Sequence, residues 1–266
     1  MYEREWYDTV PFCSNKEKKW IIVIESNISM FFFISGFLFK HKKQDEVTIS
    51  GFVKKKAKAL LIPYFAFGTI FYIVELVTME ISIDPLLHLL WINTGGLPIA
   101  GALWFLTALF ITEVLYFFID RYISKDVIKW IIVIIISVFG NLAGIILPFT
   151  LPYAAGAAMV GVGFFHVGYS LRKNENNRLV GSILNMKWYM WGISACVVTV
   201  LIFVNGYVNM RSEEYGIIPL FWINAILATL VGMNLARYVY QVCKKNMVAR
   251  WLMGIGRDSI IYVCLN

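Results

Sequence analysis

The chain alternates long apolar runs with short polar segments, and this pattern gives the first prediction of its fold. An α-helix needs about 20 apolar residues to cross a hydrocarbon layer of about 30 Å. Seven runs reach roughly that length, at residues 20–39, 59–79, 102–119, 130–147, 151–171, 188–204 and 218–236. An eighth begins near Ser259 and ends at Asn266, and a helix of that length covers only about 12 Å. The pattern therefore predicts an all-α, polytopic transmembrane helix bundle with about seven full spans and a truncated eighth.

The positive charges between the runs predict how the chain is oriented. Eighteen of the 24 Lys and Arg residues lie in the segments after the first, third, fifth and seventh runs, whereas the opposite loops hold only Arg211. Cytoplasmic loops are enriched in Lys and Arg, so the lysine-rich side is expected to be cytoplasmic. The charged segment 1–19 has no signal-peptide pattern. We therefore expect residues 20–266 to be a partial membrane domain, incomplete at both ends, of a multi-pass protein in a bacterial cell membrane.

Composition agrees with a membrane protein and excludes several other classes. Hydrophobic residues make up 59% of the chain and charged residues 15%, and the mean hydropathy is +0.68, which fits no soluble class. The net charge of +7 lies in loops between apolar runs, so nucleic acid is not an expected partner and the lipid bilayer is. The four cysteines form no pair or cluster with metal-ligand spacing, and no metal site is expected.

A short polar-apolar segment separates the second and third runs. Asp84 followed by Pro85 is a typical N-cap and first-turn pair. It predicts a short helix that continues through Leu90 to Trp91. Because this segment is too short to cross the membrane, we expect an interfacial helix on the outer face, with Trp91 at the level of the lipid headgroups.

Three glutamates fall inside the predicted spans, at Glu25, Glu75 and Glu113. Ionisable groups inside a membrane are costly, so each is a functional candidate. Glu113 lies in the body of the third span and could serve as an acid, a base or an anchor for a cationic partner. A structural hydrogen bond to a neighbouring helix explains it as well. Glu25 and Glu75 lie closer to the outer end, where their carboxylates can reach water.

The chain has three histidines, in three different settings. His41 lies among lysines and is typical of a cytoplasmic loop. His88 follows Asp84 by four residues, a spacing that places both on one helix face and permits either an acid/base pair or a solvated polar face. His166 lies in the inner part of the fifth span, where a polar contact between helices is favoured over catalysis.

Two further motifs have competing explanations. Ala157 and Gly161 form a small-xxx-small pair, which predicts close helix packing. A basic run just before the second span, formed by Lys54, Lys55, Lys56 and Lys58, could bind anionic lipid or a phosphorylated cofactor such as coenzyme A.

Several sequence pieces together suggest a family. They are MFFFISGFLF at 30–39, FVKKKAKALLIPY at 52–64, LWFL at 103–106 with Glu113 following, and GIGRDS at 254–259. In this order, from Met30 to Asn266, they resemble the acyltransferase type 3 family of integral-membrane acyltransferases.

The resemblance implies transfer of an acyl group, usually acetyl, from cytoplasmic acyl-CoA to a hydroxyl of a cell-envelope carbohydrate or similar acceptor. This chemistry is O-acetylation by an acyltransferase for groups other than amino-acyl groups. It implies acyl-CoA as the donor and no stably bound cofactor. In the family a histidine acts as general base on the hydroxyl, and basic residues on the inner side hold the coenzyme A phosphates. By position, Lys54, Lys55, Lys56 and Lys58 match the second role.

The chain departs from the family pattern at the expected base. The family's first helix, which carries an arginine and a histidine, has no counterpart before Trp20. The histidine that commonly precedes the FFFISG stretch is Asn27 here, and the proline after it is Ser29. In the basic motif, Lys56 and Ala59 stand where two arginines are usual, so the bidentate contact with phosphate is lost.

These departures leave three catalytic candidates, Glu113, Asn27 and His88. Asparagine can orient a hydroxyl but cannot take its proton near neutral pH, so we expect the chain as given to be catalytically silent. The alternative function is a non-catalytic, transporter-like or structural membrane protein, with a polar path lined by Glu113, Asn224 and Asn234.

Overall fold

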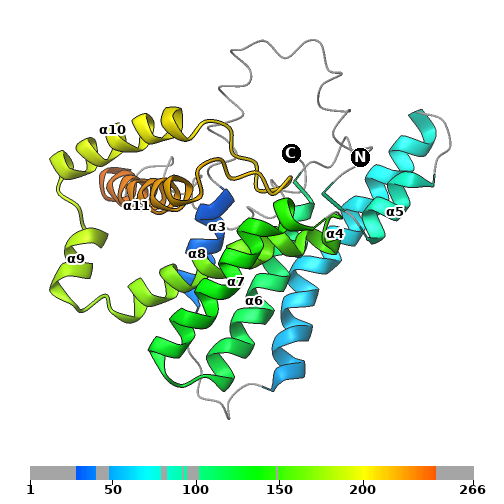
Figure 1. The fold of residues 1–266 in the computed structure, drawn as a ribbon, viewed down its shortest axis with the longest axis horizontal. Helices are drawn as coiled ribbons and strands as arrows, with labels where there is room; N and C mark the ends of the chain where they lie inside the picture. The colour runs from blue at the N-terminus through cyan, green and yellow to red at the C-terminus, as the bar shows by residue number, and fades with distance from the viewer. Residues whose placement is uncertain are drawn as a thin grey trace.

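The structure is a computed structural model, and it describes residues 28–39, 48–78, 83–91, 93–94, 102–147 and 149–243. Within these residues the fold is helical, apart from an isolated β-bridge between Asn209 and Glu214. The elements shown in Figure 1 are α3 (Ile28–Leu38), α4 (Ile49–Thr78), α5 (Asp84–Leu90), α6 (Trp104–Tyr122), α7 (Asp126–Ile146), the single turn η1 (Pro152–Ala154), α8 (Ala155–Lys173), α9 (Arg178–Leu184), α10 (Trp188–Asn205) and α11 (Ile218–Cys243). The predicted all-α class is confirmed.

Five helices among the described residues are long and apolar enough to cross a membrane. Their bounds are Ile49–Val77, Asp126–Ile146, Pro152–Lys173, Trp188–Asn205 and Ile218–Gln241. Helix α6 has 19 residues but carries three charged side chains near its middle and inner end. The described part of the first run is α3, with 11 residues. A multi-pass membrane protein is therefore supported, whereas the predicted number of seven spans is not confirmed. The segment that begins near Ser259 lies outside the described residues.

Helix α8 is the centre of the bundle, and its glycines allow neighbouring helices to approach closely. A Cβ atom on Gly168 would lie 2.1 Å from the carbonyl oxygen of Phe33, and one on Gly36 would lie 1.9 Å from that of Phe165. The backbones of α3 and α8 are therefore in direct contact. Gly161 faces Phe32 in the same way, which confirms the packing role predicted for this small-residue stretch.

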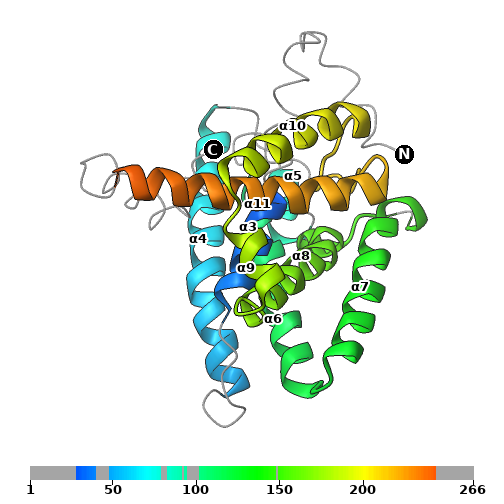
Figure 2. The same ribbon diagram turned by 90° about the vertical axis from the view of Figure 1, so that its left-hand side faces the viewer.

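Helices α10 and α11 pack against each other and lie across the direction of α4, α6 and α7 (Figure 2). The side chain of Asn234 on α11 ties this pair to α9 and the turn after it, because its Nδ2 group donates to the carbonyl of Ile183 and its Oδ1 atom accepts from the Met186 amide. The pattern of apolar runs predicts the helices but does not predict that α10 and α11 cross the others.

Helix α4 begins at Ile49, ten residues before the start predicted from its apolar run at 59–79. The basic run Lys54, Lys55, Lys56 and Lys58 therefore lies on the helix and not in a loop before it. The reason is that lysine is a good helix former and no residue in this segment interrupts the helix. Successive lysines consequently point in different directions around the helix axis.

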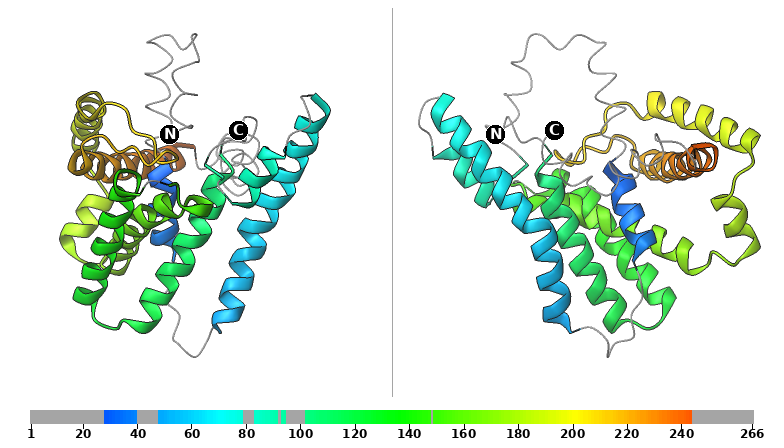
Figure 3. Two further views of the ribbon diagram at one scale, coloured as in Figure 1. Left: turned by 45° about the vertical axis from the view of Figure 1, so that its right-hand side comes forward. Right: turned by 180° about the vertical axis from the view of Figure 1, so that it is seen from behind.

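Helix α5 lies beside the predicted outer end of α4 (Figure 3). Its N-cap position falls on Ile83 and not on Asp84, so the predicted cap is displaced by one residue. Ile83, Leu87 and Trp91 are exposed, as expected for an interfacial helix with an apolar side toward lipid.

The segment after α5 is held by three side chains from distant parts of the chain. Helix C-termini leave carbonyl groups without partners inside the helix. Here the Tyr64 hydroxyl donates to the carbonyl of Leu89. Tyr153 donates through its hydroxyl to the carbonyl of Leu90 and through its backbone amide to the carbonyl of Trp91. Arg211 donates to the carbonyl of Thr94. This outer junction ties the C-terminal end of α5 to α4, to η1 and to the loop before α11.

Candidate active site

Helix α6 presents a stripe of buried polar side chains. Glu113, Tyr116 and Asp120 are spaced three and four residues apart, which places them on one side of the helix. Their residues are only 6%, 0% and 8% exposed. In a membrane, a buried polar group without a partner is costly, so each of these side chains is expected to meet a complementary group.

Each member of the stripe meets a basic side chain from a different helix. The ammonium group of Lys56 on α4 donates to Glu113 Oε1 at 2.7 Å. The Tyr116 hydroxyl and His166 Nδ1 on α8 share a hydrogen bond of 2.8 Å. Lys129 on α7 donates to Asp120 Oδ1. Three helices are thus tied to α6 by polar contacts in the interior of the bundle.

Glu113 is the member of the stripe best suited to chemistry. Its Oε1 atom is paired with Lys56, whereas its Oε2 atom is buried and has no hydrogen-bond partner. The Lys56 side chain is 29% exposed, so the pair lies at the border between the interior and the lysine-rich end of α4. A carboxylate oxygen with a free lone pair can accept a proton from a hydroxyl placed next to it.

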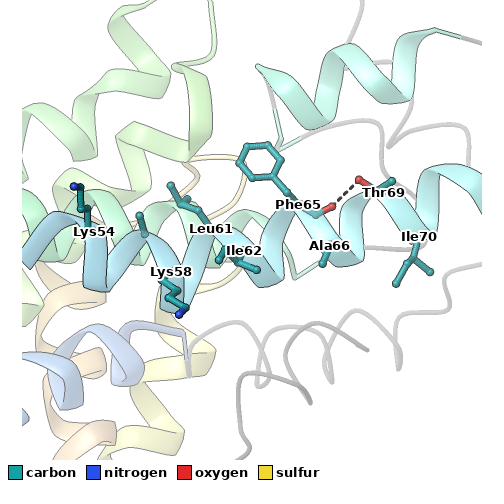
Figure 4. A pocket seen from close by; sticks show the side chains of 9 residues that line it. Lys54, Lys58, Leu61, Ile62, Phe65, Ala66, Thr69 and Ile70 are labelled. Carbon is teal, nitrogen blue, oxygen red and sulfur yellow. Dashed lines mark hydrogen bonds between the residues drawn. The ribbon is translucent and has the colours of Figure 1, made fainter. Parts of the chain in front are cut away.

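The basic run is divided between two sides of α4. Lys56 is half-buried and faces Glu113, whereas Lys54, Lys55 and Lys58 are exposed. Lys54 and Lys58 line a groove on a different face of the helix (Figure 4). The structure therefore brings one of the four predicted cofactor-binding lysines to the candidate catalytic carboxylate.

The other two catalytic candidates do not join Glu113 among the described residues. His88 lies at the outer junction, where its Nδ1 atom is buried without a hydrogen-bond partner. The carbonyl of its neighbour Leu89 accepts a hydrogen bond from Tyr64 on α4. Tyr64 lies eight residues after Lys56, which corresponds to about 12 Å of helix. The Asp84 side chain and Asn27 lie outside the described residues, so the proposed pair with His88 and the role of Asn27 stay predictions.

Sequence reasoning missed the inner end of the stripe. Lys129 counted as a charge of the cytoplasmic loop, yet the structure buries it to 4% exposure beside Asp120. The spacing of Glu113, Tyr116 and Asp120 was a usable signal, because three polar residues on one helix face predict a polar interior. The predicted helix contact of His166 is confirmed, with Tyr116 as its partner.

No group of three or more His, Cys, Asp or Glu side chains within the described ranges could hold a metal ion. The candidate site thus consists of the buried carboxylate of Glu113, its partner Lys56 and the exposed Lys55 beside Lys56 in the sequence.

Comparison with known proteins identifies the family of the chain. The family model for an acyltransferase domain of type 3 matches residues 18–264, which is nearly the whole chain. No curated protein and no solved structure matches it. The described helices that could span a membrane fit the same assignment. The chain belongs to the acyltransferase type 3 family of membrane acyltransferases.

Proposed function

We propose that this protein transfers an acyl group, preferably acetyl, from acyl-CoA to a hydroxyl of a cell-surface carbohydrate or similar acceptor. Family membership supports acyl transfer. The observation that carries the assignment to particular residues is the Glu113 carboxylate, which is buried, paired through one oxygen with Lys56 and unpartnered at the other. Such a group is suited to take a proton from a hydroxyl inside a low-dielectric site.

In the proposed reaction, Glu113 Oε2 takes the proton of the acceptor hydroxyl while the hydroxyl oxygen attacks the thioester carbonyl carbon. The tetrahedral intermediate then loses its carbon–sulfur bond, and the leaving thiolate of coenzyme A takes the proton from Glu113. The products are an ester and a free thiol, and Glu113 returns to the carboxylate form. Lys56 favours that charged form, because an opposite charge within hydrogen-bond distance stabilises it.

The lysine-rich end of α4 is proposed to receive the donor. Lys55 is exposed and directly precedes the half-buried Lys56 on α4, about 100° away around the helix axis. Phosphate groups bound by ammonium groups form charge-assisted hydrogen bonds, each worth about 1.5–3 kcal/mol. We expect a donor held there to direct its thioester toward Glu113. The predicted orientation makes this end cytoplasmic, where acyl-CoA is found.

The transporter-like alternative rested on a polar path through Glu113, Asn224 and Asn234. Asn234 is engaged in three hydrogen bonds, to the amide of Met186 and the carbonyls of Ile183 and Leu230. Bonds of this kind fix helices relative to one another. They support a structural role for Asn234 and favour the acyltransferase over a transport path.

The experiment measures transfer from labelled acetyl-CoA in membranes that contain the chain, with the label recovered as a base-labile ester. Glu113→Gln keeps the shape of the side chain but removes the base, and general-base catalysis typically contributes about 10²- to 10⁴-fold. Glu75→Gln, a glutamate on the neighbouring helix α4, is the control. Loss in Glu113→Gln alone supports the proposal, and equal transfer by both variants contradicts it.

A further inference from the structure

A shallow, open groove runs along one face of α4, away from Glu113. Its volume is about 810 Å³. The described residues that line it are Lys54, Ala57, Lys58, Leu61, Ile62, Phe65, Ala66, Thr69 and Ile70. Figure 4 shows the two lysines toward one end of this row and Ile70 at the other.

The groove is apolar along its length. Ala57 and Ala66 are small and leave room between larger neighbours such as Ile62 and Phe65. The hydroxyl of Thr69 donates to the carbonyl of Phe65 at 2.7 Å, so this polar group is satisfied within the helix. Its lining therefore suits a hydrocarbon chain.

The inner end of the groove is cationic. Lys54 and Lys58 are exposed, and among the described residues neither belongs to an ion pair. Their ammonium groups extend to opposite sides of α4 in Figure 4. An anionic headgroup at this end would meet a positive charge on each side. Lys56 is not available to it, because it faces Glu113.

The length of the groove matches one leaflet of a bilayer. Lys58 and Ile70 are twelve residues apart, which corresponds to about 18 Å of helix. Half of a hydrocarbon core of about 30 Å is about 15 Å. The predicted orientation places the lysines at the cytoplasmic headgroups, where anionic lipids and basic side chains attract each other.

We propose that this groove is a binding site for an anionic phospholipid of the cytoplasmic leaflet. The headgroup phosphate lies at Lys54 and Lys58, and one acyl chain follows the apolar residues toward Ile70. This site goes beyond the proposed acyl transfer and gives the basic run two tasks. Lys56 serves the carboxylate of Glu113, whereas Lys54 and Lys58 hold a lipid on the other side of α4.

The test is native mass spectrometry of the purified full chain titrated with dioleoyl-phosphatidylglycerol and, separately, with dioleoyl-phosphatidylcholine. The double variant Lys54→Gln/Lys58→Gln should weaken phosphatidylglycerol binding on the order of 10- to 30-fold, because each lysine near an anionic headgroup contributes about a factor of five. The charge-matched control Lys125→Gln/Lys187→Gln, made at two exposed lysines outside α4, should keep the binding.

A second variant tests the acyl-chain part without a change in charge. Ala66→Phe fills the hollow and should also reduce phosphatidylglycerol binding, whereas Val74→Phe, at an exposed position on another face of α4, should not. Palmitoyl-CoA is titrated in parallel. Unchanged phosphatidylglycerol binding in both groove variants overturns the proposal. It is also overturned if these variants lose palmitoyl-CoA binding alone, because the groove would then be a donor site.

Discussion

The buried ion pair between Lys129 and Asp120 makes a quantitative prediction about stability. Their residues are 4% and 8% exposed, and the ammonium group donates directly to Asp120 Oδ1. Removal of one partner leaves an uncompensated charge in the interior, which typically costs about 3–5 kcal/mol. Lys129→Met and Asp120→Asn should therefore each be strongly destabilising. The double variant leaves no unpaired charge, so it should recover most of this loss.

The assay is an unfolding titration with sodium dodecyl sulfate in mixed micelles, carried out on the four members of the double-mutant cycle. The single losses should not add, and the coupling energy should reach about 2 kcal/mol or more. The exposed pair Lys173 and Asp126 serves as the reference cycle, with a coupling of about 0–1 kcal/mol. Additive losses at Lys129 and Asp120, within about 0.5 kcal/mol, would refute the reasoning.

Three further predictions concern helix packing, the pH dependence of stability and the orientation of the chain. Gly36→Ala should lower the free energy of unfolding by about 1–3 kcal/mol, because the new methyl group would meet the Phe165 carbonyl at 1.9 Å. Gly192→Ala on α10, where the new methyl group would have no neighbour within 4 Å, should be neutral or stabilising in the same titration. Burial raises the pKa of Glu213, in the loop before α11. The free energy of unfolding should therefore fall as the pH rises from about 4.3 through the raised pKa. Glu213→Gln should flatten this slope, whereas Glu214→Gln, at an exposed neighbour, should not. In a cysteine-free background, a membrane-impermeant maleimide added from outside should label Ser212→Cys but not Lys125→Cys, and the opposite pattern would reverse the orientation.

The apolar runs predicted most of the helices, and the deviations have physical causes. The runs at 130–147 and 188–204 correspond to α7 and α10 within a few residues. Helix α4 extends further because lysines interrupt an apolar run without interrupting a helix. The short helix α9 has too few apolar residues for a membrane span. Its place depends on the hydrogen bond that Asn234 donates to Ile183 and on the one that it accepts from Met186, which no local pattern reveals.

The candidate site was predictable only in part, for reasons of tertiary packing. Glu113 stood out because a carboxylate within an apolar run is costly. Its partner Lys56 lay within a run of similar lysines, and only the direction in which each points around α4 separates it from Lys54 and Lys58. Lys129 counted among the charges of a cytoplasmic loop, and Asp120 was not singled out in the sequence. The pairing of Asp120 with Lys129 arises because α6 and α7 both pack against α8.

The central claim is that Glu113 is the base for acyl transfer, and transfer from labelled acetyl-CoA tests it most directly. The chain is assayed alone, as Glu113→Gln, as Glu75→Gln, and with a family first helix fused to its N-terminus. The account predicts transfer by the chain alone that is lost in Glu113→Gln and kept in Glu75→Gln. The substitution of Asn27 for the family histidine predicts the opposite, a silent chain. Transfer by the extended chain only, or undiminished transfer by Glu113→Gln, would contradict the role of Glu113.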